Sequence, residues 1–304
     1  MGGKTMHKTH KQKIRITSGE RAFDAANGLF LFLLMVVTLY PLLYVLFASM
    51  SDPSRLAMHQ GLLLFPDGFS LEAYGAVAKN PMIGRGYWNT LVIMSTGTLL
   101  NLFMTSLGAF VLSRRNLPYK KGMALLILFT MFFSGGLIPR YLIVTGLGLL
   151  DSFLAILLPT AINTYNMIVM RTSFESIPES LEESAAIDGA NDFIVLARIV
   201  LPLSMPVVAV MLLFYGVSHW NSWFSAMIYL RTRTKFPLQL ILREILITNS
   251  LDSMTTNVGS LDKEPIGETI KYATIVVATI PVLVIYPFLQ KYFTKGMLIG
   301  AIKA

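Results

Sequence analysis

Long apolar stretches separated by short polar segments occupy most of the 304-residue chain. A helix needs about 20 apolar residues to cross the roughly 30 Å hydrocarbon core of a bilayer. Six stretches are predicted to span a membrane on this criterion: residues 28–50, 88–113, 122–139, 152–170, 199–224 and 269–293. The third stretch is short and is interrupted by Ser134-Gly135-Gly136. The pattern predicts an all-α integral membrane protein with six transmembrane helices.

A further apolar stretch, residues 137–150, contains Pro139, Arg140, Gly146 and Gly148. Irregular backbone is tolerated at membrane depth only where protein or a water-filled cavity covers it. We therefore expect a re-entrant or interfacial segment here, and not a seventh span.

Composition supports a membrane location. Hydrophobic residues make up 54% of the chain and charged residues 14%, with a mean hydropathy of +0.61. Soluble domains carry about 25% charged residues. The chain has no cysteine, and its four histidines lack the spacing of metal ligands, so we expect neither thiolate chemistry nor a metal site.

The distribution of basic residues predicts the orientation. Residues 1–26 are predicted to be a basic cytoplasmic arm, residues 27–293 the six-helix membrane domain, and residues 294–304 a cytoplasmic tail. This orientation places 15 of the 25 Lys and Arg residues inside the cell. The net charge of +8 is then explained by topology and anionic lipid, and nucleic-acid binding has no support. The first span lacks the cleavage-site ending of a signal peptide.

The segment 176–202, between the fourth and fifth spans, has the pattern of two helices joined by a sharp turn. Ser176 and Glu179 have capping-box spacing, and Pro178 suits a first helical turn. These signals predict a helix over residues 177–188, which Gly189 ends in a left-handed conformation.

A second helix is expected to follow, capped by Asn191 or Asp192 and continuing through Leu201-Pro202 into the fifth span. On the first helix, small Ser184 and Ala185 lie at the centre of one face, with acidic residues around them. Two interpretations are open: docking into a cation-lined groove of a soluble partner, or a plain amphipathic surface helix.

The full spacing resembles the cytoplasmic signature of bacterial binding-protein-dependent ABC importer permeases, Glu-Ala-Ala-x3-Gly-x9-Ile-x-Leu-Pro. It occurs here as Glu183-Ser184-Ala185-x3-Gly189-x9-Ile199-Val200-Leu201-Pro202, and only Ser184 departs from it. Other segments are similar to the carbohydrate (maltose-type) class of these permeases: Tyr40-Pro41, Ser49-Met50-Ser51, Trp88-Asn89-Thr90, the Gly108–Arg114 run, Ile187-Asp188-Gly189-Ala190, Trp220-Asn221 and the Gln290–Gly296 run.

This resemblance implies one half of a heterodimeric sugar channel in the bacterial cell membrane. Its expected partners are a homologous second permease, two cytoplasmic ATPase subunits, an extracytoplasmic solute-binding protein and a sugar or oligosaccharide. The chain has no phosphate-binding loop and no catalytic constellation, so we expect no enzyme activity and no cofactor of its own, with ATP and Mg²⁺ held by the ATPase partners.

Within the type I importer fold that the resemblance implies, the loop helix couples the spans to the ATPase. The expected coupling residues are Glu182, Glu183, Ser184, Ala185, Asp188, Gly189 and Pro202. Glu183 is the expected charged contact, Ser184 and Ala185 the packing contacts, and Asp188 and Gly189 shape the turn. A solvated surface acid is the alternative for Glu183.

Polar and aromatic residues inside spans face either a cavity or another helix. The candidates for a sugar path are Asn89, Asn163, Tyr165, Tyr215, His219, Trp220 and Asn221, together with Thr90, Asn101, Asn166 and Trp223. For each of them, helix packing or interface anchoring is the alternative.

Two further questions are open at this stage. His219 permits a proton-driven secondary carrier as the alternative function, although no Asp or Glu in a span is available to relay protons. Arg231, Arg233, Lys235 and Arg243 could attract acidic oligosaccharides or contact an acidic rim on the binding protein.

Overall fold

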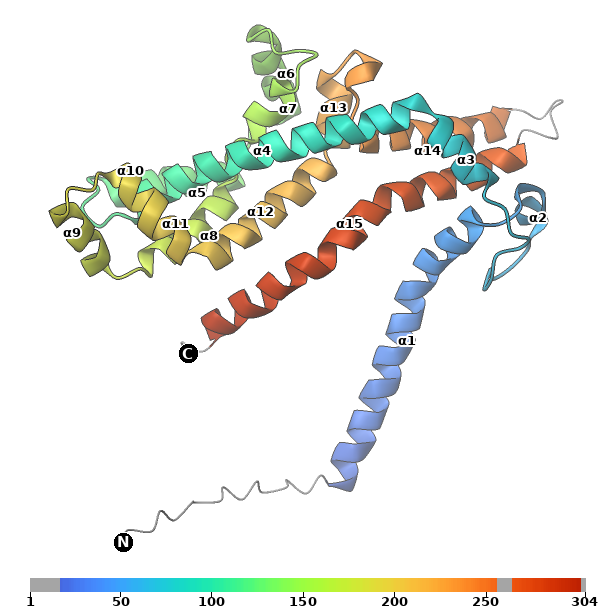
Figure 1. Ribbon diagram of the computed structural model, residues 1–304, viewed down its shortest axis with the longest axis horizontal. Coiled ribbons are helices and arrows are strands. Elements are labelled where there is room, and N and C mark those ends of the chain that lie inside the picture. Colours follow the sequence, from blue (N-terminus) through green and yellow to red (C-terminus); the bar gives the residue numbers. More distant parts are fainter. Residues whose placement is uncertain (1–16, 256–263, 302–304) are drawn as a thin grey trace.

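The computed structural model describes residues 17–255 and 264–301, and most of them are helical (Figure 1). In these ranges the single β-type pairing is an isolated bridge between Ser51 and Phe69. Most of the predicted basic arm, residues 1–16, and the last three residues of the predicted tail lie outside the described residues. The all-α class is confirmed.

Three helical stretches in the described residues are long and apolar enough to cross a membrane, or five if each of two bent helix pairs counts as one span. The three are α1 (Ser18–Ser49), α4 (Pro81–Ser113) and the Gly267–Val284 part of α15 (Glu264–Ala301). They correspond to the first, second and sixth predicted spans. The other predicted spans are bent or broken.

Helix α1 begins before the predicted span. Thr17 and Glu20 form a capping box, with the Thr17 N–H donating to the Glu20 carboxylate at 2.6 Å. The end of the predicted arm, residues 18–26, is therefore helical. Most of α1 is exposed, which suits a helix whose apolar surface faces lipid, and Figure 1 shows its first half standing apart from the other helices.

Helix α4 forms the centre of the fold and packs on α8 (Thr164–Glu175), α12 (Met205–Trp220) and α14 (Leu238–Thr255). Gly97 allows α12 to approach, because a Cβ at this position would lie 2.5 Å from the His219 ring. Nearer the start of α4, the Leu238 N–H donates to the Thr90 hydroxyl at 2.9 Å. Small and polar residues thus bring these helices together, as is usual inside membranes.

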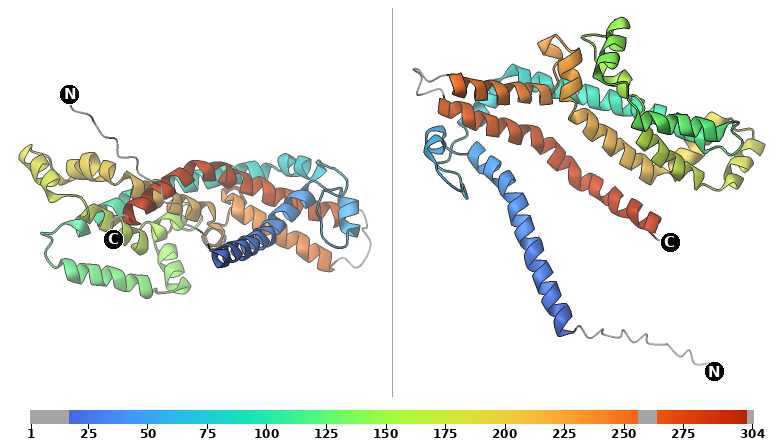
Figure 2. Two further views of the ribbon diagram at one scale, coloured as in Figure 1. Left: turned by 90° about the horizontal axis from the view of Figure 1, so that it is seen from below. Right: turned by 180° about the vertical axis from the view of Figure 1, so that it is seen from behind.

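The third predicted span is two helices, α5 (Lys120–Phe132) and α6 (Leu137–Gly146), which meet at 108°. The bend lies at residues 133–136, where Gly136 has a φ of +83°. The prediction that this span runs to residue 139 is wrong. Within the stretch 137–150, residues 137–146 form the separate short helix α6, which projects sideways from the middle of the molecule in Figures 1 and 2.

The fourth predicted span, residues 152–170, is not one helix. It is divided into α7 (Leu154–Leu157), the 3₁₀ turn η1 (Leu158–Thr160) and α8. Pro159 lies in the 3₁₀ turn, and Asn163 starts α8 by accepting the Asn166 N–H at 3.0 Å. Proline lacks the N–H that a continuous helix needs.

The sequence predicts that the second helix of segment 176–202 continues straight into the fifth span, but in the structure it does not. It comprises α10 (Asp192–Val195), the π-helical segment η2 (Leu196–Val200) and α11 (Leu201–Leu203), and it meets α12 at 88°. Pro202 and Pro206 flank the bend at Ser204, and prolines interrupt the hydrogen-bond ladder of a helix. The predicted fifth span, residues 199–224, is therefore divided at Ser204, and α12 is its longest helix.

The remaining elements lie toward the end of α4 that is opposite the loop. They are α2 (Pro53–Met58), α3 (Glu72–Lys79), α13 (Trp223–Tyr229) and η3 (Arg233–Lys235), beside α14. The loop helix α9 (Glu179–Ile187) lies at the other end of the long axis (Figure 1).

Candidate functional site

Helix α9 forms where the sequence predicts a loop helix, but its start differs. The helix begins at Glu179 with Pro178 as N-cap, and no side chain caps it. Ser176 has helical backbone angles at the end of α8, and its hydroxyl donates to the Ser173 carbonyl at 2.7 Å. The predicted capping box is wrong, because Ser176 belongs to the preceding helix.

The end of α9 agrees with the prediction. Gly189 has a φ of +81°, its N–H donates to the Ala186 carbonyl at 3.0 Å, and the Ala190 N–H donates to the Ala185 carbonyl at 2.9 Å. These two bonds are a Schellman motif. The side chain of Asn191 then caps α10 by accepting the Ile194 N–H at 2.9 Å. The turn at Gly189, which the sequence predicts, thus sets the angle between α9 and α10.

Two ion pairs fix α9 to the end of α4. Glu182 pairs with Arg114, and Glu179 with Arg115 at 3.0 Å. The Arg114 guanidinium also lies 4.0 Å above the Phe110 ring. Partial burial lowers the pKa of Arg114, opposed by the charges of Asp192 and Glu179. Glu182 therefore has a partner inside the chain.

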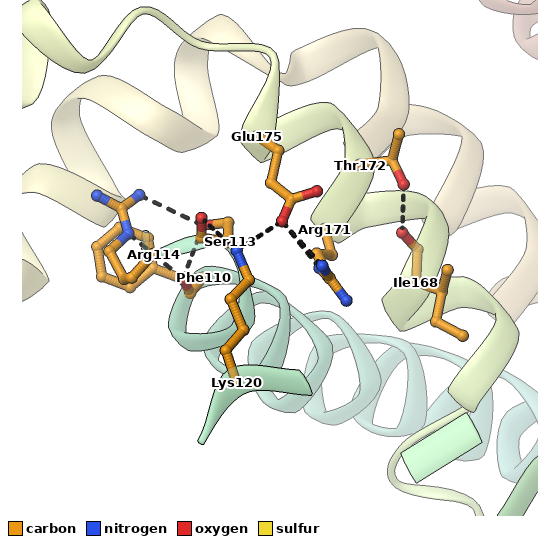
Figure 3. A network of polar contacts seen from close by, with 8 residues as sticks. All are labelled: Phe110, Ser113, Arg114, Lys120, Ile168, Arg171, Thr172 and Glu175. Atoms are coloured by element: carbon orange, nitrogen blue, oxygen red, sulfur yellow. Dashed lines mark hydrogen bonds and ion pairs between the residues drawn. The ribbon is translucent and has the colours of Figure 1, made fainter. Parts of the chain in front are cut away.

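A second group of charges braces the base of the loop (Figure 3). Glu175, at the end of α8, accepts from Lys120 of α5 at 2.9 Å and from Arg171 at 3.0 Å. Lys120 also donates to the Ser113 carbonyl at the end of α4 at 3.3 Å. Burial raises the pKa of Glu175, but bonds and charges from Lys120 and Arg171 outweigh it and lower the pKa overall. Helices α4, α5 and α8 are joined here.

The outer face of α9 is open. Glu183, Ser184 and Asp188 are exposed, and Ile187 is 87% exposed. Ala185 is partly buried and packs against the core beneath the loop. Pro202 lies in α11, beyond the π-helical segment, and belongs to the bend rather than to α9. Glu183 borders a cavity of about 480 Å³ with Glu179 and Glu182.

A second, polar cavity of about 420 Å³ lies between α4, α6, α8 and α12. Five residues of the predicted sugar path line it: Asn101, Asn163, Asn166, Tyr215 and His219. Arg140, Thr160 and Ser218 line it as well, and sequence reasoning did not place them there. The predicted path residues thus divide into a group at this cavity and a group elsewhere.

Hydrogen bonds between helices use several of the cavity residues. A His219 ring nitrogen lies 2.6 Å from the Asn101 side-chain oxygen, and the Asn101 amide donates to the Thr160 carbonyl. The Tyr215 hydroxyl lies 2.7 Å from the Thr105 hydroxyl. Asn101, His219 and Tyr215 therefore hold α4 and α12 together while they form one wall of the cavity.

The other candidates lie away from the cavity. The Asn89 amide donates to the carbonyls of Thr234 and Phe236, and Thr90 bonds Leu238. Trp220 is buried beside Tyr87, with ring centroids 6.3 Å apart.

Three further candidates are also not cavity residues. The Asn221 amide donates back to the Val217 carbonyl, Tyr165 is 54% exposed, and Trp223 lies under the Arg243 guanidinium at 4.5 Å. These residues pack, bond locally or face outward.

Three of the four basic residues proposed to attract acidic sugars have partners within the chain. Lys235 pairs with Asp151 at 2.8 Å, Arg233 with Glu244 at 2.8 Å, and Arg243 lies on Trp223.

Asp151 ties the segment after α6 to the segment after α13. Its carboxylate also accepts from the N–H groups of Arg231 and Thr232, both at 3.0 Å. The bonds from Lys235, Thr232 and Arg231 hold the pKa of the Asp151 carboxyl well below its usual range.

Comparison with known proteins decides the family. Residues 21–299 match the sequence pattern of the family described as "Binding-protein-dependent transport system inner membrane component". The chain belongs to this family. It is a membrane-embedded permease of the ABC importer type, a transport subunit and not an enzyme, as the loop signature predicted.

Relatives of this permease cover nearly its whole length. It is 43% identical over 284 residues to the polygalacturonan/rhamnogalacturonan transport system permease protein YtcP of Bacillus subtilis, covering 93% of this chain and 99% of the relative. It is 42% identical to protein LplC of the same organism, covering 94% and 97%.

A solved structure is also similar to this permease. It is a bacterial ABC transporter chain involved in the import of the acidic polysaccharide alginate, 34% identical with a TM-score of 0.82, covering 91% of this chain and 98% of that chain. The predicted type I permease fold is confirmed.

Proposed function

We propose that this permease is one half of the membrane channel of an ATP-driven importer for a sugar or oligosaccharide. Support comes from its membership of a binding-protein-dependent transport family and from similar proteins that are named for the transport of polygalacturonan/rhamnogalacturonan and of alginate. The second half is a homologous permease, and a solute-binding protein delivers the sugar. ATP and Mg²⁺ are bound by two ATPase subunits, and this chain holds no cofactor.

The end that carries α9 faces the cytoplasm, together with both chain termini. Support comes from Arg114, Arg115, Lys120 and Lys121, which follow the end of α4, since short cytoplasmic loops collect basic residues. The opposite end, with α2, α3 and α13, then faces outward and meets the binding protein.

The observation that carries the proposal is the construction of α9. Its inner side is fixed by the ion pairs of Glu182 and Glu179, while its outer side presents Glu183 and the 87% exposed Ile187. An exposed apolar side chain beside a carboxylate, on a helix whose inner side is fixed, suits insertion into a groove of a partner. The partner is the ATPase.

This arrangement of α9 explains how the motion of the ATPase is transmitted to the membrane spans. When the ATPase pair closes on ATP, it displaces α9. The ion pairs of Arg114 and Arg115 carry the displacement into α4, and the Gly189 turn carries it into α10 and the bend before α12. Both α4 and α12 line the polar cavity, so the motion changes access to that cavity.

The test is uptake into proteoliposomes that contain both permeases and the ATPase, supplied with sugar-loaded binding protein. We expect uptake that requires internal ATP and persists when a protonophore removes the proton gradient. Uptake by this chain alone that follows the proton gradient and ignores ATP would support the secondary carrier instead.

A further inference from the structure

Arg140 is a charged residue that lies deep within the membrane-spanning part of the fold. It lies on α6 and lines the polar cavity together with Asn101 of α4. Asn101 is 12 residues before Ser113, or roughly 18 Å along α4 at about 1.5 Å per residue. The hydrocarbon core is roughly 30 Å thick, so this cavity lies near its middle.

A charge at that depth is costly unless it is paired or faces water. In the part of the chain that the structure describes, Arg140 has neither an ion pair nor a hydrogen bond, and its side chain is exposed. The cost of this arginine is therefore not offset by any carboxylate of the described chain.

The cavity around Arg140 offers further polar groups. Asn163 uses its side-chain oxygen to cap α8, which leaves its amide N–H groups available. Ser218 is exposed on α12, and Phe214, one turn earlier, adds an aromatic face. Amides and hydroxyls bind sugar hydroxyls, and an aromatic ring suits the apolar face of a sugar.

Arg140 also borders a second cavity, of about 390 Å³, lined mainly by apolar residues of α6 and the 3₁₀ turn. Arg140 and Pro159 are common to both cavities. Arg140 is thus a lining residue of both cavities.

We infer that Arg140 is the carboxylate-binding residue of a saccharide site within the membrane, and that the transported oligosaccharide is acidic. A guanidinium binds a carboxylate through two parallel N–H···O bonds, and does so strongly where water is scarce. Asn163 and Ser218 contact the sugar hydroxyls. This inference rests on the proposed sugar importer and specifies its substrate class.

The test compares two probes that differ only at their carboxyl groups: a charged uronate trisaccharide and its neutral, fully methyl-esterified form. Uptake of each is measured with the complete importer in proteoliposomes, for wild type, Arg140→Gln, Arg140→Lys and the control Arg85→Gln. Arg85 is an exposed arginine of α4 that lines neither cavity. Stimulation of ATP hydrolysis by the loaded binding protein reports assembly.

We expect Arg140→Gln to lower uptake of the uronate by roughly tenfold or more relative to the ester, with stimulated hydrolysis retained. Arg140→Lys should restore part of the uronate uptake, and Arg85→Gln should resemble wild type. Equal uptake by wild type and Arg140→Gln, an equal loss for both probes, or loss of assembly would overturn the inference.

A failure of the inference is distinguishable from a failure of the proposed function. A wild-type importer that carries neutral oligosaccharides but refuses the uronate contradicts the acidic site and leaves the importer intact. A wild-type complex that imports no saccharide with ATP contradicts both.

Discussion

The turn at Gly189 gives the most quantitative test of the proposal that α9 transmits the motion of the ATPase to the membrane spans. Its φ of +81° lies in the left-handed region, and a Cβ added there meets no atom within 4 Å. A substitution therefore acts through backbone strain alone and not through a clash. An L-residue in this conformation costs roughly 1–2 kcal/mol, which corresponds to a factor of about 5–30 in the population of the turn.

The perturbation is Gly189→Ala, and the chain supplies a closely matched control. Gly148 has a φ of +68°, open space around its Cβ position, and the same pair of turn bonds at the end of α6, from Gly148 to Thr145 and from Leu149 to Val144. Gly148→Ala imposes similar strain far from α9. Gly189→Asn tests rescue, because asparagine tolerates the left-handed region.

The assay is ATP hydrolysis stimulated by loaded binding protein, together with uptake, in complexes of verified composition. We expect Gly189→Ala to lower both by up to roughly 5–30-fold, Gly189→Asn to recover most of the loss, and Gly148→Ala to keep stimulated hydrolysis. The bulkier Gly189→Val should be more severe than Gly189→Ala, with insertion into the membrane intact. Wild-type behaviour of Gly189→Ala, or an equal loss from Gly148→Ala, would refute the claim that this turn transmits work.

The other predictions concern the charges of α9. Glu183→Ala should weaken retention of the ATPase in a co-purification assay, by about 2–5 kcal/mol if docking buries the carboxylate and by no more than about 1 kcal/mol if the pair stays at a rim. Glu183→Lys should weaken retention further. The control Asp24→Ala, which removes an exposed acid on α1, should have little effect. A double-mutant cycle of Arg114→Ala and Glu182→Ala should give a coupling energy of at least about 0.5 kcal/mol in stimulated hydrolysis, whereas strict additivity would show that this ion pair does not brace α9.

Much of the fold follows from local signals that can be read from the sequence. The uninterrupted apolar runs of α1 and α4 specify their spans, and Gly189 and Asn191 specify the turn and the cap beside α9. Hydropathy averages over a window, however, and does not detect where a helix bends. The breaks at Gly136, Pro159 and Ser204 lie inside apolar runs, so the third, fourth and fifth spans were predicted too long.

The cavity was predictable only in part, because its walls come from segments far apart in sequence. Asn101 and His219 are 118 positions apart, yet their side chains bond each other. Arg140 lies in the segment that the sequence predicts to be re-entrant or interfacial, and the structure places it on the lining of a cavity with residues of α4, α8 and α12. In the same way, Lys235 pairs with Asp151, 84 positions away, so it is not the free basic residue that the sequence alone suggests.

The most direct test of the account is a cross-link from α9 to the ATPase. The chain has no cysteine, so Ile187→Cys introduces a single thiol at the exposed end of α9. A matched control is Leu64→Cys, 60% exposed beyond α2 near the opposite end of the molecule. With a short thiol-to-amine cross-linker in membranes that contain the whole importer, the account predicts a product between the Ile187→Cys chain and the ATPase and no such product for Leu64→Cys. Absence of the ATPase product for Ile187→Cys, or its formation from Leu64→Cys instead, would contradict the claim that α9 joins this permease to its energy source.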